Sequence, residues 1–502
     1  MSRGKGIDLL LVHPGNRALV YQSLGAELAA IEPPAWAAMM ATFVRNNGYS
    51  VAVLDTEADG LDPQQAADKI LDIDPLLTAI VVYGHQPSAS TQNMPAASEV
   101  VNALKDRDPS TKTLLVGGHV AALPERTLRE ERADFVAGGE GPHTVLELLQ
   151  ALKSRGSGLA KVKGLWYWEN GAVKANPPAP LVKDLDREIP ELAWDLVSVP
   201  KYRAHNWHCF GGLPRQPYAA LYTTLGCPYH CSFCCIQAPF KSGEALAGLN
   251  SSVNTYRFWS PESVVGQIDK LVENYGVRNL RILDEMFVLN KHHVHGICDL
   301  IVERGHDLNM WAYARIDTVE DDLTLEKLKR AGVNWLCFGI ESADESVRDD
   351  VRKGYQQEKI FNTIARVNSA GIKVIGNYIF GLPEDDLASM QSTLDLAMEL
   401  NSEFANFYSA MAYPGASLYD TAVRNQWSLP EKWSGYSQHS VDTLPLPTNH
   451  LTSSEVLRFR DEAWQTYFNA PEYLEMVSRK FGNQTVQEIQ EMASHTLVRT
   501  YA

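Results

Sequence analysis

Three cysteines stand close together in the stretch GCPYHCSFCC, with the spacing Cys227-x3-Cys231-x2-Cys234. Three thiolates on one short loop can hold three irons of a [4Fe-4S] cube, which leaves the fourth iron without a protein ligand. A structural zinc ion needs a fourth ligand, usually from a second Cys or His pair downstream, and no such pair is evident in the sequence. His230 fits better as a solvated loop residue, and Cys235 as a small buried hydrophobe. A redox or zinc-binding loop stays open as the alternative.

The composition favours a metal site in a reducing compartment. The chain has 502 residues, a formal net charge of −16 and seven cysteines. An odd, small and clustered set of cysteines fits a metal site better than a disulfide framework, so we expect a cytoplasmic protein. The acidic balance argues against nucleic acid as a bulk partner. No apolar run is long enough to span a bilayer, and the N-terminal run IDLLLVHP indicates a strand rather than a signal peptide.

The elements that must position the cysteines follow an α/β alternation of apolar strands and amphipathic helical patterns. We expect a doubly wound, Rossmann-like parallel sheet first, then a connector with a hairpin at Asn170-Gly171, and then six strand–helix units that form an incomplete (β/α)6 barrel. The capping box Thr452-x-x-Glu455 introduces a mostly helical C-terminal region. The predicted limits of these four parts are residues 1–154, 155–215, 216–425 and 426–502.

The cysteine spacing, placed directly after the first barrel strand and with Phe233 before the last cysteine, resembles the signature of the radical SAM superfamily. In that superfamily the open iron chelates the amino and carboxylate groups of S-adenosylmethionine. An electron passed from the cluster cleaves the sulfonium to give methionine and a 5′-deoxyadenosyl radical. The resemblance implies that Cys227, Cys231 and Cys234 bind the cluster, that Phe233 contacts S-adenosylmethionine, and that an external donor such as flavodoxin or ferredoxin supplies the electron.

Four further segments fall at the ends of successive predicted strands, where such barrels place their chemistry. LRILDEMF resembles the motif that holds the methionine ammonium, and WAYARID supplies a guanidinium for the methionine carboxylate. CFGIESADESV resembles the ribose motif, and NYIFGLPED the adenine motif G-x-I-x-G-x-x-E, from which it departs at Asn377 while Glu384 matches. Each residue alone has a structural alternative, but their order favours cofactor binding. The implied S-adenosylmethionine contacts are Asp284, Glu285, Arg315, Glu341, Ser342, Asn377, Ile379 and Gly381.

Glycines and hydroxyls gather where the strands of the first sheet end, the edge at which open α/β folds bind ligands. The segments YGHQPSASTQNM, LLVGGH and ADFVAGGEG resemble the cobalamin-binding domain that precedes the radical SAM barrel in one subclass. A doubly wound domain without a ligand is the alternative. The implied cobalamin contacts are Gly84, Ser88, Thr91, Gly117, Gly118, His119, Gly138, Gly139 and Glu140.

The motif Asp-x-His-x-x-Gly, whose histidine replaces the dimethylbenzimidazole base in cobalamin mutases, does not occur in the sequence. His13, His85 and His119 stand at strand ends without that context. We therefore expect base-off cobalamin whose lower face meets water or another side chain.

The resemblance to cobalamin-dependent radical SAM enzymes implies methyl transfer to an unactivated carbon or phosphorus of a small polar substrate, carbohydrate-like or a phosphonate. One S-adenosylmethionine methylates cob(I)alamin, and a second gives the radical that removes hydrogen from the substrate. No catalytic base is assigned. A cobalamin-dependent cyclase or ring-rearranging enzyme is the first alternative. A methylthiotransferase is disfavoured, because that group needs a second cluster in its N-terminal domain and the first cysteine here is Cys209. A non-enzymatic cobalamin sensor or carrier is a further alternative.

Overall fold

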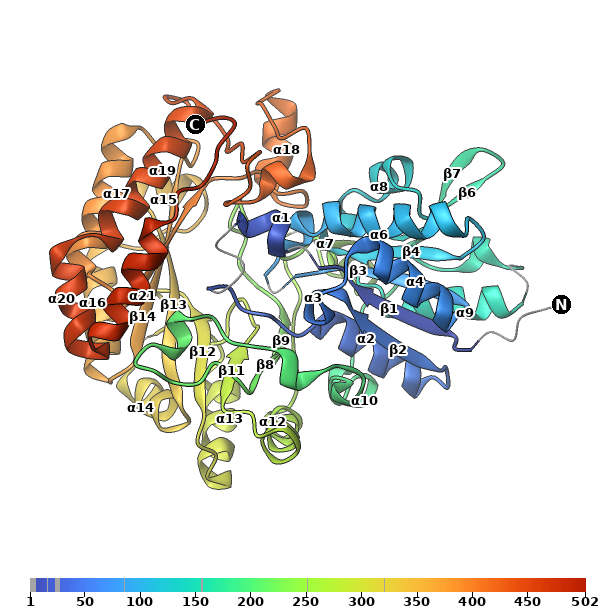
Figure 1. The fold of residues 1–502 in the computed structure, drawn as a ribbon, viewed down its shortest axis with the longest axis horizontal. Coiled ribbons are helices and arrows are strands. Elements are labelled where there is room, and N and C mark those ends of the chain that lie inside the picture. Colours follow the sequence, from blue (N-terminus) through green and yellow to red (C-terminus); the bar gives the residue numbers. More distant parts are fainter. Residues whose placement is uncertain are drawn as a thin grey trace.

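Two parallel sheets lie next to each other in the molecule, and a set of helices from the C-terminal part of the chain covers the second sheet (Figure 1). The computed structural model describes residues 6–15, 17–22, 28–84, 86–154, 157–250, 252–319 and 321–502. His85, one of the histidines considered above, lies outside the described residues. The α/β class predicted from the sequence is confirmed.

The first sheet has seven strands in the order β2-β1-β3-β4-β5-β6-β7, and the strands from β1 to β5 pair in parallel. β3 and β4 are buried along their whole length, as expected for parallel strands covered on both faces. The strands are β1 (Leu9–His13), β2 (Val51–Asp55), β3 (Leu77–Val82), β4 (Thr113–Gly117), β5 (Phe135–Ala137), β6 (Leu165–Glu169) and β7 (Ala172–Ala175).

Helices cover both faces of this sheet. α2 and α9 pack on one face and α4 and α6 on the other, so each face has its own apolar cluster. Five short helices follow the strand ends or lie between the longer helices. The helices are α1 (Arg17–Tyr21), α2 (Ala35–Asn46), α3 (Thr56–Asp59), α4 (Pro63–Ile73), α5 (Ala89–Gln92), α6 (Met94–Arg107), α7 (Gly118–Ala122), α8 (Pro124–Glu130) and α9 (Pro142–Lys153).

The predicted hairpin is confirmed, and it extends the first sheet. Asn170 and Gly171 both have positive φ, 52° and 77°, as a tight two-residue hairpin turn requires. β6 pairs antiparallel with β5, so the hairpin that we placed in the connector belongs to the first sheet. The predicted domain limits stay predictions. The connector then contains α10 (Leu185–Glu188) and the short 3-10 helices η2 (Leu159–Lys161), η3 (Trp194–Leu196), η4 (Val199–Lys201) and η5 (Trp207–Cys209).

The second sheet is the expected incomplete barrel. Its six strands run in the order β15-β14-β13-β12-β11-β8 and are parallel throughout. β9 (Thr224–Gly226) and β10 (Tyr256–Phe258) form a separate antiparallel pair beside the barrel. The strands are β8 (Tyr218–Leu221), β11 (Asn279–Ile282), β12 (Asn309–Ala314), β13 (Val333–Glu341), β14 (Lys373–Phe380) and β15 (Phe404–Ser409). The associated helices are α11 (Lys241–Leu246), α12 (Pro261–Tyr275), α13 (Lys291–Arg304), α14 (Asp322–Arg330), α15 (Glu345–Asp350), α16 (Gln357–Ser369), α17 (Leu387–Leu400) and α18 (Ser417–Arg424).

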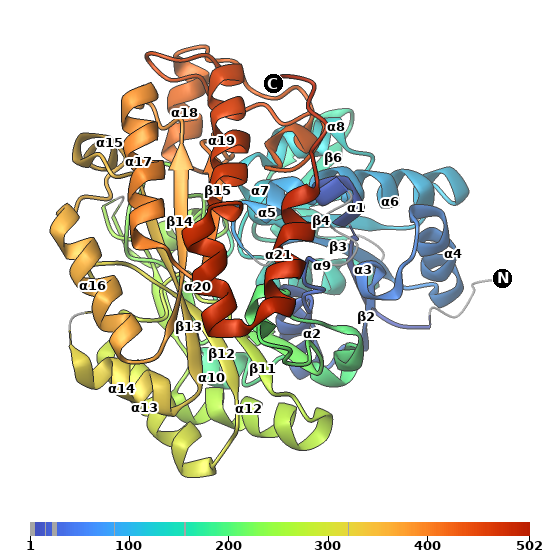
Figure 2. The same cartoon turned by 60° about the vertical axis from the view of Figure 1, so that its left-hand side comes forward.

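The C-terminal region is helical, as predicted. It contains η6 (Trp433–Tyr436), α19 (Ser453–Phe468), α20 (Pro471–Phe481) and α21 (Asn483–Ser494). The capping box is present, since the Thr452 side chain accepts from the backbone N–H of Glu455 and the Glu455 side chain accepts from that of Thr452. Figure 2 shows α19, α20 and α21 over the side of the barrel formed by β14 and β15.

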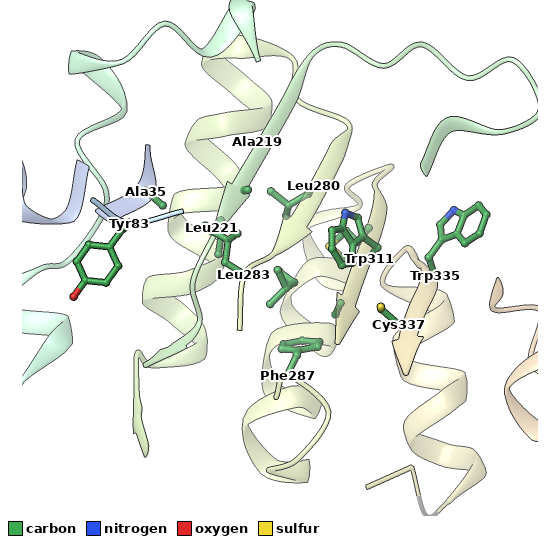
Figure 3. Close-up of a cluster of buried hydrophobic side chains, with 14 of the residues drawn as sticks. Ala35, Tyr83, Ala219, Leu221, Leu280, Leu283, Phe287, Trp311, Trp335 and Cys337 are labelled. Carbon is green, nitrogen blue, oxygen red and sulfur yellow. The ribbon is translucent and has the colours of Figure 1, made fainter. Parts of the chain in front are cut away.

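One apolar core runs through both sheets. Ala35 and Tyr83 of the first domain belong to the same buried cluster as Leu221, Leu283 and the other barrel residues of Figure 3. The two domains are therefore joined by buried apolar surface, the main stabilising contribution to association. None of the helices in the described part of the chain has both the length and the apolar character needed to cross a bilayer.

Candidate functional site

The cysteine loop begins with a glycine that no other residue can replace without strain. Gly226 has φ +91°, and a Cβ at this position would lie 2.2 Å from the carbonyl oxygen of Thr255. The loop then turns on its own backbone, where the N–H of Cys234 donates to the oxygen of Cys231 at 3.1 Å. The side chain of Gln237 donates to the carbonyl oxygen of Cys227 at 2.6 Å. These bonds hold the three cysteines on one compact turn.

Positive charge reaches the thiols from one arginine. The Nη1 atom of Arg315 lies 3.6 Å from the Sγ atom of Cys231, while the rest of the guanidinium is held by Asp317 at 2.9 and 3.0 Å and lies 3.9 Å from the centre of the Tyr229 ring. A methionine carboxylate, the predicted partner of Arg315, would therefore compete with Asp317 for the guanidinium. Burial raises the pKa of the Cys227 thiol to about 12, so a thiolate at this position needs a cation beside it.

The three thiols are the kind of ligand that an iron–sulfur cluster requires. Within the described residues, no group of three or more His, Cys, Asp or Glu side chains is arranged around one metal ion. A cube places each thiolate on a different iron, so its ligands converge less tightly than those of a zinc ion. Cys235 is buried beside the loop, in agreement with its expected role as a hydrophobe.

The two adjacent acids at the end of β11 have different surroundings. Asp284 accepts from the backbone N–H groups of Thr223 and Thr224 at 2.6 and 3.0 Å, so it braces the segment that leads to the cysteine loop. Burial raises the pKa of Asp284 to about 6 against these hydrogen bonds, which lower it. Glu285 instead borders two cavities, and burial raises its pKa to about 7 while Arg281 lowers it. Glu285 is thus the acid that a cationic ligand can reach.

Glu341 is held in an unusual conformation toward a cavity. Its φ of +65° is rare for a residue other than glycine and costs on the order of 1 kcal/mol. The buried ammonium of Lys353 pairs with the Glu341 carboxylate and lies 5.8 Å from the centre of the Phe233 ring. A strained, paired carboxylate at a strand end is a preorganised acceptor for ligand hydroxyls.

The predicted adenosine contacts divide into two groups. Asn377 and Ile379 line the same cavity as Glu341. Ser342 is fully buried and lies 3.2 Å from the Thr393 hydroxyl. Gly381 has φ +81°, and a Cβ there would come within 2.4 Å of Val456, so this glycine permits α19 to approach β14.

One cavity brings most of the predicted S-adenosylmethionine contacts together. It also receives Ser88 from the first domain and Gln438 from the C-terminal region. The cavity is lined by Gln86, Pro87, Ser88, Gln92, Phe233, Cys234, Cys235, Glu285, Tyr313, Glu341, Asn377, Ile379, Leu382, Tyr408, Ser409, Ala410, Met411, Tyr413 and Gln438. A cysteine of the predicted cluster, the acids Glu285 and Glu341, and a loop of the first domain therefore line the same cavity.

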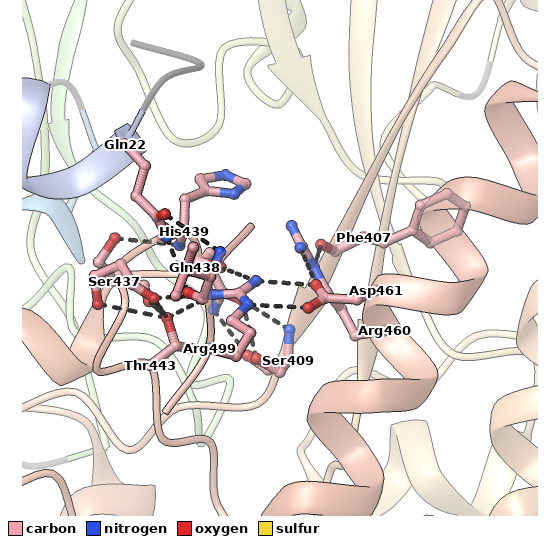
Figure 4. A network of polar contacts seen from close by, with 12 residues as sticks. Gln22, Phe407, Ser409, Ser437, Gln438, His439, Thr443, Arg460, Asp461 and Arg499 are labelled. Carbon is pink, nitrogen blue, oxygen red and sulfur yellow. Dashed lines mark hydrogen bonds and ion pairs between the residues drawn. The ribbon is translucent and has the colours of Figure 1, made fainter. Parts of the chain in front are cut away.

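Gln438 is fixed in the wall of this cavity by a buried polar network (Figure 4). Its side chain accepts from the backbone N–H of Ser409 at 2.9 Å and donates to the Ser409 oxygen at 2.9 Å, at the end of β15. Arg499 donates to the Gln438 backbone oxygen at 3.0 Å and to both carboxylate oxygens of Asp461 at 2.9 Å. Sequence reasoning missed this residue, because Gln438 belongs to a loop without a motif.

A second cavity lies at the carboxyl edge of the first sheet. Gly84 and Gly118 line it together with Trp36 and Tyr83, whose rings stack at 4.0 Å. The Tyr83 hydroxyl is buried and has no hydrogen-bond partner among the described residues. An orphaned hydroxyl beside flat rings and the backbone of Gly118 fits a ligand that carries amide groups, such as a corrin.

The remaining predicted cobalamin contacts do not line this cavity. His119 is buried under the Trp433 ring at 4.3 Å, its Nδ1 atom lies 3.2 Å from the Thr91 hydroxyl, and burial lowers its pKa to about 3. Glu140 pairs with Arg257 at 2.7 Å and accepts from the N–H of Val182 at 2.8 Å, so it joins the first domain to the barrel.

The other glycines serve packing. A Cβ on Gly117 would lie 2.1 Å from the Val82 oxygen, and one on Gly138 would lie 2.6 Å from the Trp166 indole nitrogen. A Cβ on Gly139 would lie 3.2 Å from the hydroxyl of Ser242, which belongs to the barrel domain. These positions need glycine because neighbouring strands and the barrel approach the backbone closely.

Two domain profiles match the chain. The B12 binding domain matches residues 21–149, and the radical SAM superfamily matches residues 221–397. The first match covers β2 to β5 of the first sheet, and the second covers β11 to β14 of the barrel.

Several curated relatives span most of the chain. An uncharacterized methyltransferase of Pyrococcus horikoshii is 28% identical and aligns over 94% of this chain and 94% of its own. The anaerobic magnesium-protoporphyrin IX monomethyl ester cyclase of Rubrivivax gelatinosus is 26% identical over 82% of this chain and 69% of its own. The cytidylyl-2-hydroxyethylphosphonate methyltransferase of Streptomyces wedmorensis is 24% identical over 78% of each chain.

A solved structure has the same fold. The radical S-adenosylmethionine methyltransferase TsrM from Kitasatospora setae, with cobalamin and a [4Fe-4S] cluster bound, superposes with a TM-score of 0.64 at 18% identity. The superposition covers 83% of this chain and 74% of that one.

A B12-binding sheet in front of a radical SAM barrel, with a three-cysteine loop at their junction, defines an enzyme that combines both cofactors. The chain has the B12 binding domain and the radical SAM domain that such enzymes combine, and its expected resemblance to the radical SAM methyltransferases is confirmed. Its cofactors are a [4Fe-4S] cluster, S-adenosylmethionine and cobalamin. The individual contact residues stay predictions.

Proposed function

We propose that the enzyme transfers a methyl group to an unactivated carbon of a small molecule. The observation that supports this most is the adjacency of the two cavities, which share Gln86, Pro87, Cys235 and Glu285. A ligand on the first sheet and a ligand on the cysteine loop would thus meet in one protected space. When bound, S-adenosylmethionine supplies a hydrogen-abstracting radical and cobalamin supplies the methyl group.

The reaction balances with two molecules of S-adenosylmethionine and two electrons from an external reductant, a flavodoxin or ferredoxin. The substrate exchanges one hydrogen for a methyl group, and the other products are S-adenosylhomocysteine, methionine and 5′-deoxyadenosine. In this proposal Cys227, Cys231 and Cys234 hold the cluster. Glu285 pairs with the methionine ammonium of S-adenosylmethionine, because a buried cation requires a counter-charge. Glu341 accepts from the ribose hydroxyls.

Labelled products test the function. The protein is reconstituted without oxygen with iron, sulfide and cobalamin, and is given S-adenosylmethionine with a deuterated methyl group and a pool of small molecules. We expect a product that gains the labelled methyl group, together with S-adenosylhomocysteine and 5′-deoxyadenosine, only when cobalamin is present. Release of 5′-deoxyadenosine with an unmethylated product would instead identify the cyclase that the Rubrivivax relative represents.

The adjacent acids provide a matched pair of variants. Glu285→Gln is expected to weaken S-adenosylmethionine binding, measured by equilibrium dialysis, and to leave thermal unfolding near that of the wild type. Asp284→Asn is expected to lower the unfolding temperature, because two backbone N–H groups lose a charged acceptor worth about 1.5–3 kcal/mol each. The reverse outcome would assign the ammonium to Asp284.

Two observations support different classes of substrate. The Streptomyces relative acts on a phosphonate, which agrees with a phosphorus-containing substrate. The barrel interior described next favours an uncharged molecule. We also propose a cytoplasmic location, where the reducing environment preserves the thiols.

A further inference from the structure

A second large cavity, which we call the lumen chamber, occupies the inside of the open barrel. Residues two apart on a strand point to the same face, and the chamber is lined by such alternate residues: Phe404, Asn406 and Tyr408 on β15, and Trp311 and Tyr313 on β12. It shares Gln86, Gln92, Tyr313, Tyr408 and Gln438 with the cavity that holds the predicted S-adenosylmethionine contacts. A molecule in the lumen chamber would therefore lie next to that cofactor.

Aromatic rings form the floor of the lumen chamber. Trp207 from the connector lies edge-on to Trp311 at 5.1 Å and to Trp335 at 5.6 Å, and its ring is 5.9 Å from that of Phe404. Trp207, Trp311 and Phe404 line the chamber and belong to three separate elements, so the floor is fixed before any ligand binds. Trp464 from α19 also lines the chamber, near His439. Rigid rings of this kind contact flat apolar surfaces at little cost in conformational entropy.

The charged side chain that lines the lumen chamber already has a partner of opposite charge. Among its described lining residues, Arg281 is the one with a permanent charge, and its Nη1 atom lies 2.9 Å from Glu32. The guanidinium also lies 4.3 Å from the centre of the Trp311 ring. Burial, with Arg460 and Arg499 nearby, holds the pKa of His439 well below its usual range, which keeps that imidazole neutral. A phosphate or phosphonate would find no unused cation here, and burying it would be costly.

Neutral amides supply the polar groups of the chamber. Asn406 donates to Asn377 at 2.9 Å, and Asn377 donates to the Cys337 sulfur at 3.2 Å, so the orientation of both amides is set from within the barrel. Gln438 is fixed by Ser409 and Arg499 as described above. Fixed amides beside aromatic rings recognise the polar edge of a flat molecule rather than a charge.

We propose that the lumen chamber binds the substrate, and that this substrate is uncharged and carries a flat aromatic or heteroaromatic ring with polar groups on its edge. This inference rests on the proposed methyl transfer for the role of substrate, but the binding itself is independent of turnover. It replaces the phosphonate and carbohydrate classes that the sequence suggested.

Binding of matched ring compounds tests the chamber. The reconstituted holoenzyme is dialysed to equilibrium without oxygen against naphthol, naphthyl phosphate or methyl glucoside. We expect naphthol to bind about tenfold more tightly than naphthyl phosphate, which has the same ring and adds a charge. Methyl glucoside, which has hydroxyls but no ring system, is expected to show no saturable binding. Equal or tighter binding of naphthyl phosphate, or saturable binding of the glucoside alone, would overturn the proposal.

Variants locate the binding site. Trp464→Leu and Tyr408→Leu each remove one ring of the chamber and are expected to weaken naphthol binding about three- to tenfold. Trp168→Leu is the control, because this tryptophan is 43% exposed and does not line the chamber. Unchanged naphthol binding in both chamber variants would refute the location. Methyl transfer to another substrate without naphthol binding would refute the proposed substrate site but not the proposed methyl transfer. Naphthol binding without methyl transfer to any candidate would refute the methyl transfer but not the binding site.

Discussion

Removal of the Glu140 charge should loosen the joint between the two domains. The Glu140 side chain is 3% exposed, its Oε1 atom lies 2.7 Å from Arg257, and Arg257 is 12% exposed. Deleting one partner of a buried ion pair costs about 3–5 kcal/mol, since the remaining charge is left unpaired. In Glu140→Gln the amide oxygen can still accept from the N–H of Val182, so we expect the lower end, about 3 kcal/mol.

Urea unfolding followed by near-UV circular dichroism measures this loss. With a slope of about 3 kcal/mol per M, the midpoint should fall by about 1 M. Glu130→Gln is the matched control, because its pair with Arg126 is more than 40% exposed on both sides and should change stability by less than about 1 kcal/mol. A double variant with Arg257→Gln should cost less than the sum of the single changes.

The same variant separates the structural role of Glu140 from the cobalamin contact that the sequence implied. We expect the folded Glu140→Gln protein to bind hydroxocobalamin with a dissociation constant close to that of the wild type. If the urea midpoint is unchanged while cobalamin binding is lost, the assignment of Glu140 to the domain joint is wrong.

Three further outcomes are expected. Cys231→Ala should abolish the brown iron–sulfur absorbance after anaerobic reconstitution and Cys235→Ala should retain it; loss in both would place Cys235 among the ligands. Gly381→Ala should destabilise the protein by about 2 kcal/mol in urea unfolding, because a Cβ there meets Val456 in a left-handed backbone, and Val456→Ala should restore part of this; no rescue would contradict the steric cause. Burial raises the pKa of Asp134, but Lys105 and other partners hold it below its usual value of 3.8, so its contribution to stability is present at neutral pH and is lost as the pH falls below about 4. Asp134→Asn should therefore show a smaller drop in urea midpoint between pH 7 and pH 3.5 than the wild type, and an equal drop would refute the assignment.

Local signals in the sequence predicted the fold well. The Asn170-Gly171 turn and the Thr452 capping box depend on a few neighbouring residues, and both are present in the structure. The alternation of buried strands with amphipathic helices predicted both parallel sheets, because burial on two faces leaves a continuous apolar run. The sequence did not predict that the hairpin extends the first sheet, since the pairing of β6 with β5 leaves no mark in the local pattern.

The orientation of side chains at the site could not be read in the same way. Asp284 and Glu285 are neighbours in sequence, and only the distant Thr223 decides that the first is a brace and the second borders the cavities. Lys353 follows a short helix and has no motif, yet it pairs with Glu341. His119 resembles a ligand in sequence, but Trp433, far along the chain, covers it. Such outcomes depend on long-range packing, which a motif does not encode.

The apolar core common to both domains also sets how the protein handles its largest cofactor. Swinging the domains apart would uncover Tyr83 and Leu221 together and break the pair between Glu32 and Arg281. A corrin bound at this interface between the two domains would dissociate slowly. It would therefore behave as a prosthetic group, bound as the polypeptide folds and retained over many turnovers. Methionine, S-adenosylhomocysteine and 5′-deoxyadenosine are small enough to exchange while this interface stays closed.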